Sequence, residues 1–354
     1  MLNSEFFDTV GFNCDVSDAN YWGFFSICGL LLRLRTLFKI ERSLDPWDSI
    51  PNEEIFPWIE KKEEKWRTLN KTDFQNIKIN NKIFPPFESN EINNLVTPSG
   101  VVYGAGYALF MKPTFFIGTI KKIERINSYK IYFVDREIVR DLFSSPGMNL
   151  GRTIYIRLTD IRHRLWEDMQ SWLSKNDILT EIIFSKYGNP KKWQFPFPEF
   201  EKIVEKYSEI VLYHEIAEQE IKDNSWNEII KNCNEYKTER ILRGIKDFVA
   251  DFSVKGPIHQ SIKNNDRELL SLYFISMGPY QKKIIKNVLI KIKELLTKDL
   301  WNEIEEIRAK ELERWENISK KITEFYKFNN WEKVKSFTDK IFKGEQNAEN
   351  YSVY

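Results

Sequence analysis

One stretch of the sequence has the residue pattern of β-strands, and helical patterns precede and follow it. Between residues 101 and 134, β-branched and aromatic runs are separated by turn signals at 112–113 and 127–128. This pattern predicts an antiparallel meander of three strands. A short helix over 136–143 and a further strand over 152–157 are expected next. The expected fold class is helix-rich α+β, with a small antiparallel sheet domain followed by an all-α helical bundle.

A proline-rich segment, residues 188–198, separates the strand-containing part from a purely helical part. Its prolines cannot continue a helix and favour an extended connector. Before the strands, helices are expected over 18–41, with Asp18 as the N-terminal cap, and over 52–69. Further helices are expected over 199–222, 226–253, 265–276, 280–297, 299–327 and 330–342. The expected parts are an N-terminal helical segment (1–70), an α+β antiparallel-sheet domain (71–187), the linker (188–198) and an all-α bundle (199–345).

The charge balance and the cysteine content narrow the class of protein. The chain of 354 residues has 53 basic and 52 acidic side chains, and both halves are nearly neutral, which argues against broad nucleic-acid binding. The three cysteines have neither a disulfide-framework nor a zinc-finger spacing. The longest apolar run, 21–32, is too short to span a membrane, and the acidic N-terminus lacks a secretory signal. A soluble cytoplasmic protein without membrane attachment is expected.

Several common catalytic motifs are absent from the sequence. Gly104-Ala105-Gly106 lacks the third glycine of a phosphate-binding loop, so these glycines are interpreted as a bulge or a close backbone approach within a strand. There is no GxxxxGK[ST] loop and no Gly-x-Ser-x-Gly elbow. The HExxH motif of zinc peptidases is not satisfied, because Glu218 stands where the second histidine would be.

The chain has only three histidines, His163, His214 and His259, which limits its catalytic and metal-binding options. His214 and Glu218 are four residues apart on one expected helix, so both side chains project from the same face. A histidine and a carboxylate at this spacing can hold one metal ion, as in the di-iron and di-manganese centres of helical bundles. The leading hypothesis is a metal-binding protein of the non-haem iron or manganese type, serving redox or oxygen-handling chemistry.

Further ligands for this metal are expected from other helices. Asp247 and Asp251 are again four residues apart, on the next helix, and His259 follows a break at Gly256-Pro257. Glu41 ends the first long helix and offers another carboxylate oxygen. The expected metal ligands are therefore His214, Glu218, Asp247, Asp251, His259 and Glu41.

Three alternatives to the metal site stay open. The first is purely structural, because Glu239, Arg243 and Asp247 also fit an ion-pair ladder along one helix. The second is a non-enzymatic interaction or scaffold protein, which predicts a large exposed apolar patch for a protein partner. The third is RNA or another polyanion on the face formed by the arginines from Arg152 to Arg164. Whether the protein is an enzyme, and whether its partner is a small molecule or a protein, stays open.

Several phrases of the sequence, in order, resemble one family. They are NCDVSDANYWGFFSIC, PSGVVYGAGYALFMKPTFFIG, GRTIYIRLTDIRHRLWEDMQSW, YHEIAEQE and SLYFISMGPYQKK. Together they resemble an uncharacterised family of bacterial hypothetical proteins over about residues 10–325. The resemblance implies a two-part cytoplasmic protein with no established activity, cofactor or catalytic residue. His214, Glu215 and Glu218 match the histidine and the two acids of the family's pattern at this segment.

Overall fold

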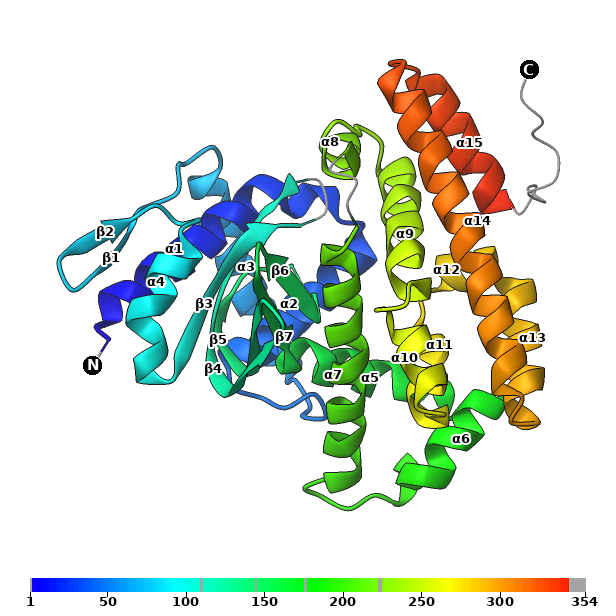
Figure 1. Cartoon of the computed structure of the whole chain (residues 1–354). Coiled ribbons are helices and arrows are strands. Elements are labelled where there is room, and N and C mark those ends of the chain that lie inside the picture. The colour runs from blue at the N-terminus through cyan, green and yellow to red at the C-terminus, as the bar shows by residue number, and fades with distance from the viewer. Residues whose placement is uncertain (1, 109–110, 144, 175–176, 222–224, 344–354) are drawn as a thin grey trace. The chain divides into compact units, whose positions relative to one another are not determined.

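The computed structural model describes residues 2–108, 111–143, 145–174, 177–221 and 225–343. Contacts within the chain divide it into two compact units, Met1–Glu167 and Asp168–Tyr354, and each unit is described by itself. The elements of both units are labelled in Figure 1. The proline-rich segment 188–198 lies inside the second unit, where it contains the short 3-10 helix η4 (Pro190–Lys192). The four-part organisation, as a statement about independently folding parts, stays a prediction.

Several helices precede the central sheet of the first unit along the chain. They are α1 (Ser4–Tyr21), the 3-10 helix η1 (Trp22–Phe24), α2 (Ile27–Glu41), α3 (Asn52–Leu69), α4 (Ser89–Val96) and the 3-10 helix η2 (Thr97–Ser99). Helix α5 (Leu158–Trp172) begins in this unit, and the division after Glu167 falls within it. The helix predicted over 52–69 is confirmed by α3.

The prediction of one continuous helix over 18–41 is wrong. Helix α1 begins at Ser4 and ends at Tyr21, where the 3-10 helix η1 follows. Helix α2 then begins after its N-cap Ser26, whose hydroxyl accepts a hydrogen bond from Gly29 N at 3.2 Å. Asp18 is therefore not a cap but lies near the end of α1, 1% exposed. Its carboxylate accepts from the backbone N–H of Leu142 and pairs with the Lys112 ammonium at 3.1 Å. These long-range partners are invisible in the local sequence.

A five-stranded sheet with the strand order β3-β4-β5-β7-β6 forms the centre of the first unit. Its strands are β3 (Val101–Tyr107), β4 (Pro113–Ile126), β5 (Tyr129–Arg140), β6 (Gly147–Leu150) and β7 (Thr153–Arg157). The antiparallel pairing of β3, β4 and β5 confirms the predicted meander. A separate antiparallel pair consists of β1 (Ile77–Ile79) and β2 (Lys82–Phe84).

The expectation of a purely antiparallel sheet is wrong, because β7 pairs with β5 in parallel. The chain returns through β6 and turns at Gly151, whose φ is +58°, so β7 is antiparallel to β6. The helix predicted over 136–143 is also wrong. Strand β5 continues to Arg140, which is paired with Phe116 of β4. The fold is helix-rich α+β, with a mixed sheet.

Of the bulge or close approach expected for this part of the sequence, Gly104 shows a close approach, made by a side-chain ring. It lies on β3 opposite Phe116 of β4. A Cβ atom added at Gly104 would lie 2.0 Å from a carbon of the Phe116 ring. The ring therefore occupies the space that any other residue would need, which explains a glycine inside a strand.

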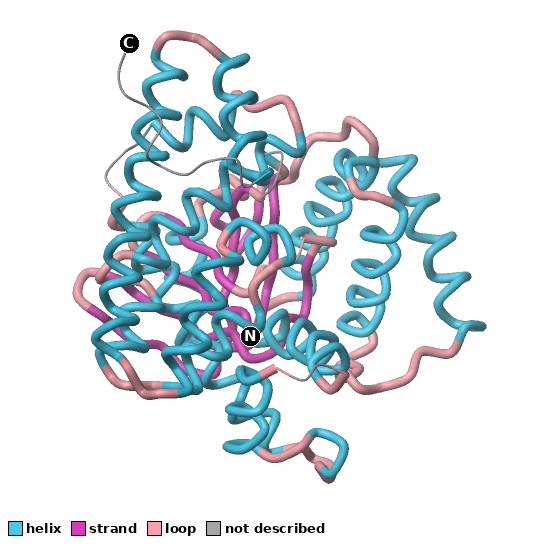
Figure 2. The backbone as a smooth tube through the Cα atoms, turned by 90° about the vertical axis from the view of Figure 1, so that its right-hand side faces the viewer, coloured by secondary structure: helices cyan, strands magenta, loops and turns pink. Residues whose placement is uncertain are grey.

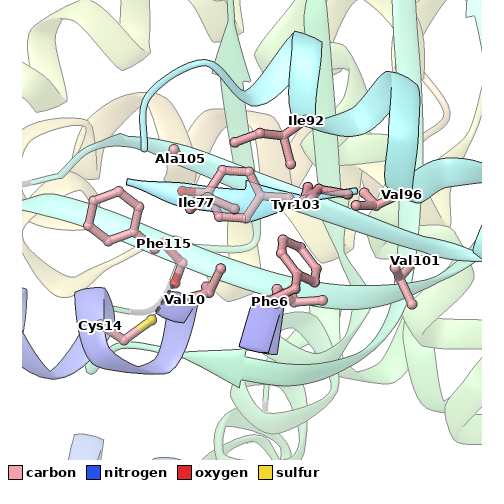
Figure 3. Packing of buried hydrophobic residues seen from close by; sticks show 12 residues of the cluster. Phe6, Val10, Cys14, Ile77, Ile92, Val96, Val101, Tyr103, Ala105 and Phe115 are labelled. Carbon is pink, nitrogen blue, oxygen red and sulfur yellow. Dashed lines mark hydrogen bonds between the residues drawn. The ribbon is translucent and has the colours of Figure 1, made fainter. Parts of the chain in front are cut away.

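A hydrophobic core lies between the helices and one face of this sheet (Figure 3). Phe6, Val10 and Cys14 of α1 pack there with Tyr103 of β3 and Phe115 of β4. The thiol of Cys14 donates to the carbonyl of Phe115 at 3.3 Å. Burial, reinforced by nearby aspartates, raises the pKa of this thiol well above its usual value. Of the other cysteines, Cys28 is exposed and Cys233 is partly buried.

The described residues of the second unit after α5 form helices and connecting segments, which Figure 2 shows in cyan and pink. The helices are α6 (Ile178–Tyr187), α7 (Pro198–Gln219), α8 (Ser225–Lys231), α9 (Tyr236–Phe252), α10 (Pro257–Lys263), α11 (Arg267–Ser276), α12 (Pro279–Ile284), α13 (Lys286–Thr297), α14 (Trp301–Lys327) and α15 (Trp331–Lys343). The segment 226–253, predicted as one helix, is divided into α8 and α9, and the segment 280–297 is divided into α12 and α13. None of the described helices combines the length and apolar character needed to cross a membrane.

Candidate metal centre

Helices α7 and α9 pack against each other and bring His214 next to Asp251. The ring Nδ1 of His214 lies 2.7 Å from Oδ1 of Asp251, and the Tyr273 hydroxyl of α11 donates to Oδ2 of Asp251 at 2.8 Å. Burial opposes protonation of the His214 ring, but the charge and the hydrogen bond of Asp251 outweigh it. The pKa of His214 is therefore raised well above its usual value.

The other ring nitrogen of His214 faces the carboxylate that follows one helical turn later. Nε2 of His214 lies 4.0 Å from Oε2 of Glu218, as the spacing of four residues predicts. His214, Glu215 and Glu218 offer ligand atoms that all lie within 4.8 Å of one another. Lys246 of α9 contacts the same group, with its ammonium 2.5 Å from Oε1 of Glu218.

Asp247 is the second carboxylate that α9 contributes. Burial raises its pKa from 3.8 to about 7, and the negative charges of Asp251 and Glu218 add to this effect, while His214 and Lys246 oppose it. The side-chain amide of Gln281 donates to Asp247 Oδ2 at 3.4 Å. We call His214, Glu215, Glu218, Asp247 and Asp251 the α7–α9 cluster.

Two of the predicted metal ligands have other partners. His259 of α10 lies with Nδ1 3.3 Å from Oε2 of Glu305 on α14. Glu41, at the end of α2 in the first unit, binds the Lys62 ammonium at 2.7 Å and accepts from Trp58 Nε1 at 2.8 Å. The structure thus brings four of the six predicted residues together and gives His259 and Glu41 other side-chain partners.

Sequence reasoning missed several residues of this site. Glu215 was not among the expected metal ligands, although it is 6% exposed and lies beside His214 and Glu218. Lys246, Tyr273 and Gln281 reach the cluster from α9, α11 and α12. Two of them, Tyr273 and Gln281, lie in the phrase SLYFISMGPYQKK that carried part of the family resemblance, and that phrase was a usable signal.

The structural alternative was an ion-pair ladder of Glu239, Arg243 and Asp247, and the first of its two ion pairs is present. Arg243 pairs with Glu239 at 2.8 Å, as the spacing of four residues predicts. Asp247, the next expected step of the ladder, belongs instead to the α7–α9 cluster.

The arginines of the proposed polyanion face do not share one exposed surface. Arg157 is 1% exposed and donates from Nε to Oε1 of Glu137 at 2.5 Å. Arg162 pairs with Asp135 at 2.8 Å. The exposed apolar surface that the interaction hypothesis predicts has members on η1 and α2: Phe24, Ile27, Leu31 and Leu32 are each more than half exposed. Neither partner class is tested by these observations.

Comparisons with known proteins identify a family but no activity. Two family models match the chain, and both describe a family of unknown function, DUF6866. The N-terminal domain of the family matches residues 5–157 and its C-terminal domain matches residues 162–345. No curated protein and no solved structure matched the chain. The resemblance to an uncharacterised two-part family is confirmed: the chain belongs to the DUF6866 family of unknown function.

Proposed function

We propose that this protein binds one divalent transition-metal ion, iron or manganese, at the α7–α9 cluster, with His214 as the central ligand. The observation that carries the proposal is the 2.7 Å contact between Nδ1 of His214 and Asp251, which leaves Nε2 directed at Glu218. Histidines that ligate metals usually donate their other ring N–H to a carboxylate, which fixes the tautomer and the ring orientation. Asp251 is therefore proposed to orient the ligand rather than to ligate the metal.

The chemistry of the cluster suits a cation, because four of its five members are carboxylates. A metal ligand must be the neutral imidazole, so a bound ion would displace the proton that the raised pKa of His214 favours. Carboxylates with little contact to water need a compensating cation or a proton. Glu215 and Asp251 are each less than 7% exposed, so water screens them poorly. A divalent ion bound by His214, Glu218 and Asp247 would compensate this charge.

Lys246 offers a further test of the proposal, because its ammonium and a bound metal would compete for the Glu218 carboxylate. Its ammonium is 2.5 Å from Glu218, the carboxylate proposed as a ligand. A metal that binds Glu218 must displace this contact or share the carboxylate. Lys246→Met is therefore expected to strengthen metal binding, whereas a purely structural cluster would be destabilised by the same change.

The redox or oxygen-handling role is proposed as the use of this metal. Such chemistry needs a coordination position that is open to a small molecule. The His214 side chain is 25% exposed and that of Glu218 is 22% exposed, so the cluster is reachable from solvent. Oxygen consumption by iron-loaded protein is the assay for this step, and it is separate from the test of binding.

The binding test is metal stoichiometry after anaerobic reconstitution of the full chain with Fe²⁺ or Mn²⁺. Wild-type protein is expected to retain about one equivalent. Asp251→Asn is expected to weaken binding by about 10–100-fold, since an outer carboxylate contributes that much to affinity. His214→Gln is expected to abolish it. The matched control is His259→Gln, which replaces another helical histidine paired with a glutamate and should leave binding unchanged.

Circular dichroism and the melting temperature of each variant separate loss of a ligand from loss of folding. Retention of less than about a tenth of an equivalent by folded wild-type protein refutes the proposal. Equal losses in His214→Gln and His259→Gln would assign any bound metal to unspecific sites.

A further inference from the structure

Basic residues are in excess on the first turns of α9, on α12 and on α15, three helices of the second unit that Figure 1 labels. Helix α15 contacts both α9 and α12. Residues 235–243, 279–286 and 331–343, which cover these turns and helices, contain ten lysines and arginines but only four acids. Between residues 269 and 293 the sequence has five lysines and no acid. The near-neutral total of each half of the chain therefore conceals a local positive excess.

Most of the acids in these three segments already have a basic partner from the same segments. Glu239 binds Arg243 at 2.8 Å, Asp339 binds Lys237 at 2.6 Å, and Glu235 lies 3.8 Å from Lys335. Seven bases then remain against one acid, Glu332. Among the described residues, no carboxylate lies at ion-pair distance from Arg240 or Lys283. The remaining charge is therefore positive, and it favours a polyanion.

Aromatic rings order several of these cations. The Arg240 guanidinium lies 5.4 Å from the ring centroid of Tyr236 and 4.7 Å from that of Tyr280, and Nη1 donates to the Tyr236 hydroxyl at 3.0 Å. The ammonium groups of Lys237 and Lys283 lie 5.4 and 4.3 Å from the ring centroid of Phe342. The Phe342 and Tyr280 rings are themselves 5.1 Å apart, so the contacts are continuous. We call Tyr236, Lys237, Arg240, Tyr280, Lys283 and Phe342 the α9–α12–α15 surface.

The two tyrosines stay accessible beside the cations. Tyr236 is 48% exposed and Tyr280 is 43% exposed, so the Arg240 guanidinium covers only part of each ring. Arg240 and Lys283 are exposed as well. An arginine that stacks on an aromatic ring keeps its N–H donors directed outward, and these donors match the geometry of a phosphate. An accessible ring next to such a cation offers a place for a base beside a place for its phosphate.

We propose that the α9–α12–α15 surface binds single-stranded nucleic acid without sequence preference. Arg240 and Lys283 would bind phosphates, and the exposed parts of Tyr236 and Tyr280 would stack with bases. An acidic peptide would use the cations but not the rings, and the bases of a duplex are already stacked on one another. The ring contacts therefore favour a single strand. None of these residues belongs to the arginine face from Arg152 to Arg164, and binding does not depend on the proposed metal centre.

The test is fluorescence anisotropy of a labelled oligothymidylate of about 12 nucleotides, titrated with the full chain without added metal. The expected dissociation constant at about 50 mM salt is about 1–100 μM, the range of non-specific binding. Raising the salt to about 200 mM should weaken binding about tenfold to twentyfold if three phosphates are neutralised. Unlabelled polyglutamate and a duplex of the same length are the competitors, and both should compete at least about tenfold less well than unlabelled oligothymidylate.

Two kinds of variant separate the charges from the rings. Lys283→Gln should reduce the slope of log affinity against log salt by about 0.7, since one phosphate contact is lost. The matched control is Lys263→Gln, an exposed lysine of α10 that has no ion pair within the described part of the chain and follows the opposite end of α9. Tyr280→Ala should weaken binding by about tenfold, whereas Tyr280→Phe keeps a ring and should bind as wild type does.

Circular dichroism establishes that each variant is folded, and Tyr236→Ala replaces Tyr280→Ala if the latter is not. A dissociation constant above about 1 mM at low salt overturns the proposal. Equal salt slopes for Lys283→Gln and Lys263→Gln also overturn it, as does wild-type affinity of the folded alanine variant. Competition by polyglutamate or the duplex that equals competition by the single strand would assign the surface to a different partner.

Discussion

Glu137 of β5 is the centre of a buried charge network, and its replacement by glutamine gives the sharpest test of the first unit. The carboxylate accepts from Nη1 of Arg140 at 2.8 Å and from Nε of Arg157 at 2.5 Å. Asp160 of α5 binds Arg140 at 2.5 Å and completes the network. All four side chains are 2% exposed or less, so two positive and two negative charges balance each other away from water.

Glu137→Gln keeps the shape of the side chain but removes one negative charge. The network is then left with an uncompensated buried positive charge, and the new amide N–H₂ faces a guanidinium. Removing one partner of a buried ion pair costs about 3–5 kcal/mol, a large part of the roughly 5–15 kcal/mol that stabilise a typical protein. The melting temperature should fall by about 10 °C.

Native-state hydrogen exchange at the β5 amides measures this loss for the first unit alone. The double variant Glu137→Gln with Arg157→Gln restores the charge balance, and we expect it to recover at least about 1 kcal/mol relative to additivity. The control is Glu124→Gln on β4, an acid that is 38% exposed and paired with Lys122 at 2.6 Å. It should cost about 0.5 kcal/mol or less. A loss for Glu137→Gln no larger than that of the control would refute a closed, water-free network.

Three further predictions concern the first unit. Burial lowers the pKa of His163 from 6.5 in the unfolded chain to about 4 in the folded state, so between these pH values the folded state binds fewer protons. The free energy of unfolding should therefore fall by up to about 3 kcal/mol as the pH is lowered from 6.5 to 4. Denaturant titrations of His163→Gln should lack this part of the pH dependence; an unchanged profile contradicts the assignment. Gly104→Ala should cost about 1–3 kcal/mol by overpacking, with partial rescue by Phe116→Leu in the same titration. Lys112→Met should cost about 3–5 kcal/mol, because it removes the ammonium that pairs with the buried carboxylates of Asp18 and Asp141. Burial raises the pKa of Asp18 to about 7, so this carboxyl is mostly protonated at pH 5 and the cost should be smaller there than at pH 8; equal costs at both pH values would count against this.

The parts of the fold that could be predicted from the sequence are those set by local patterns. The β3–β5 meander follows from alternating apolar runs with turn signals between them, and α3 follows from its helical charge spacing. The helix expected over 136–143 is not formed, because residues up to Arg140 extend β5 and pair with β4. The side chains of Glu137 and Arg140 on this part of the strand bind Arg157 and Asp160. Such partners cannot be read from spacing.

The same limit applies to the α7–α9 cluster. The spacing of four residues predicted that His214 would lie near Glu218, and that Asp247 and Asp251 would share a face of the next helix. Spacing does not specify which face of α9 meets α7, so the direct contact of His214 with Asp251 was unavailable to sequence reasoning. For the same reason His259 was expected at the cluster, although packing pairs it with Glu305.

The different burial of Cys14 and Cys28 allows the rate of local opening to be measured by thiol labelling. Cys28 is exposed on α2 and can react with a thiol reagent in the folded chain, whereas the buried Cys14, with its raised pKa, can react only when α1 separates from β4. Because both thiols belong to the first unit, the first reports the reagent's intrinsic rate and the second reports the frequency of opening. The ratio of the two labelling rates therefore measures how often the first unit opens locally, and no engineered label is needed.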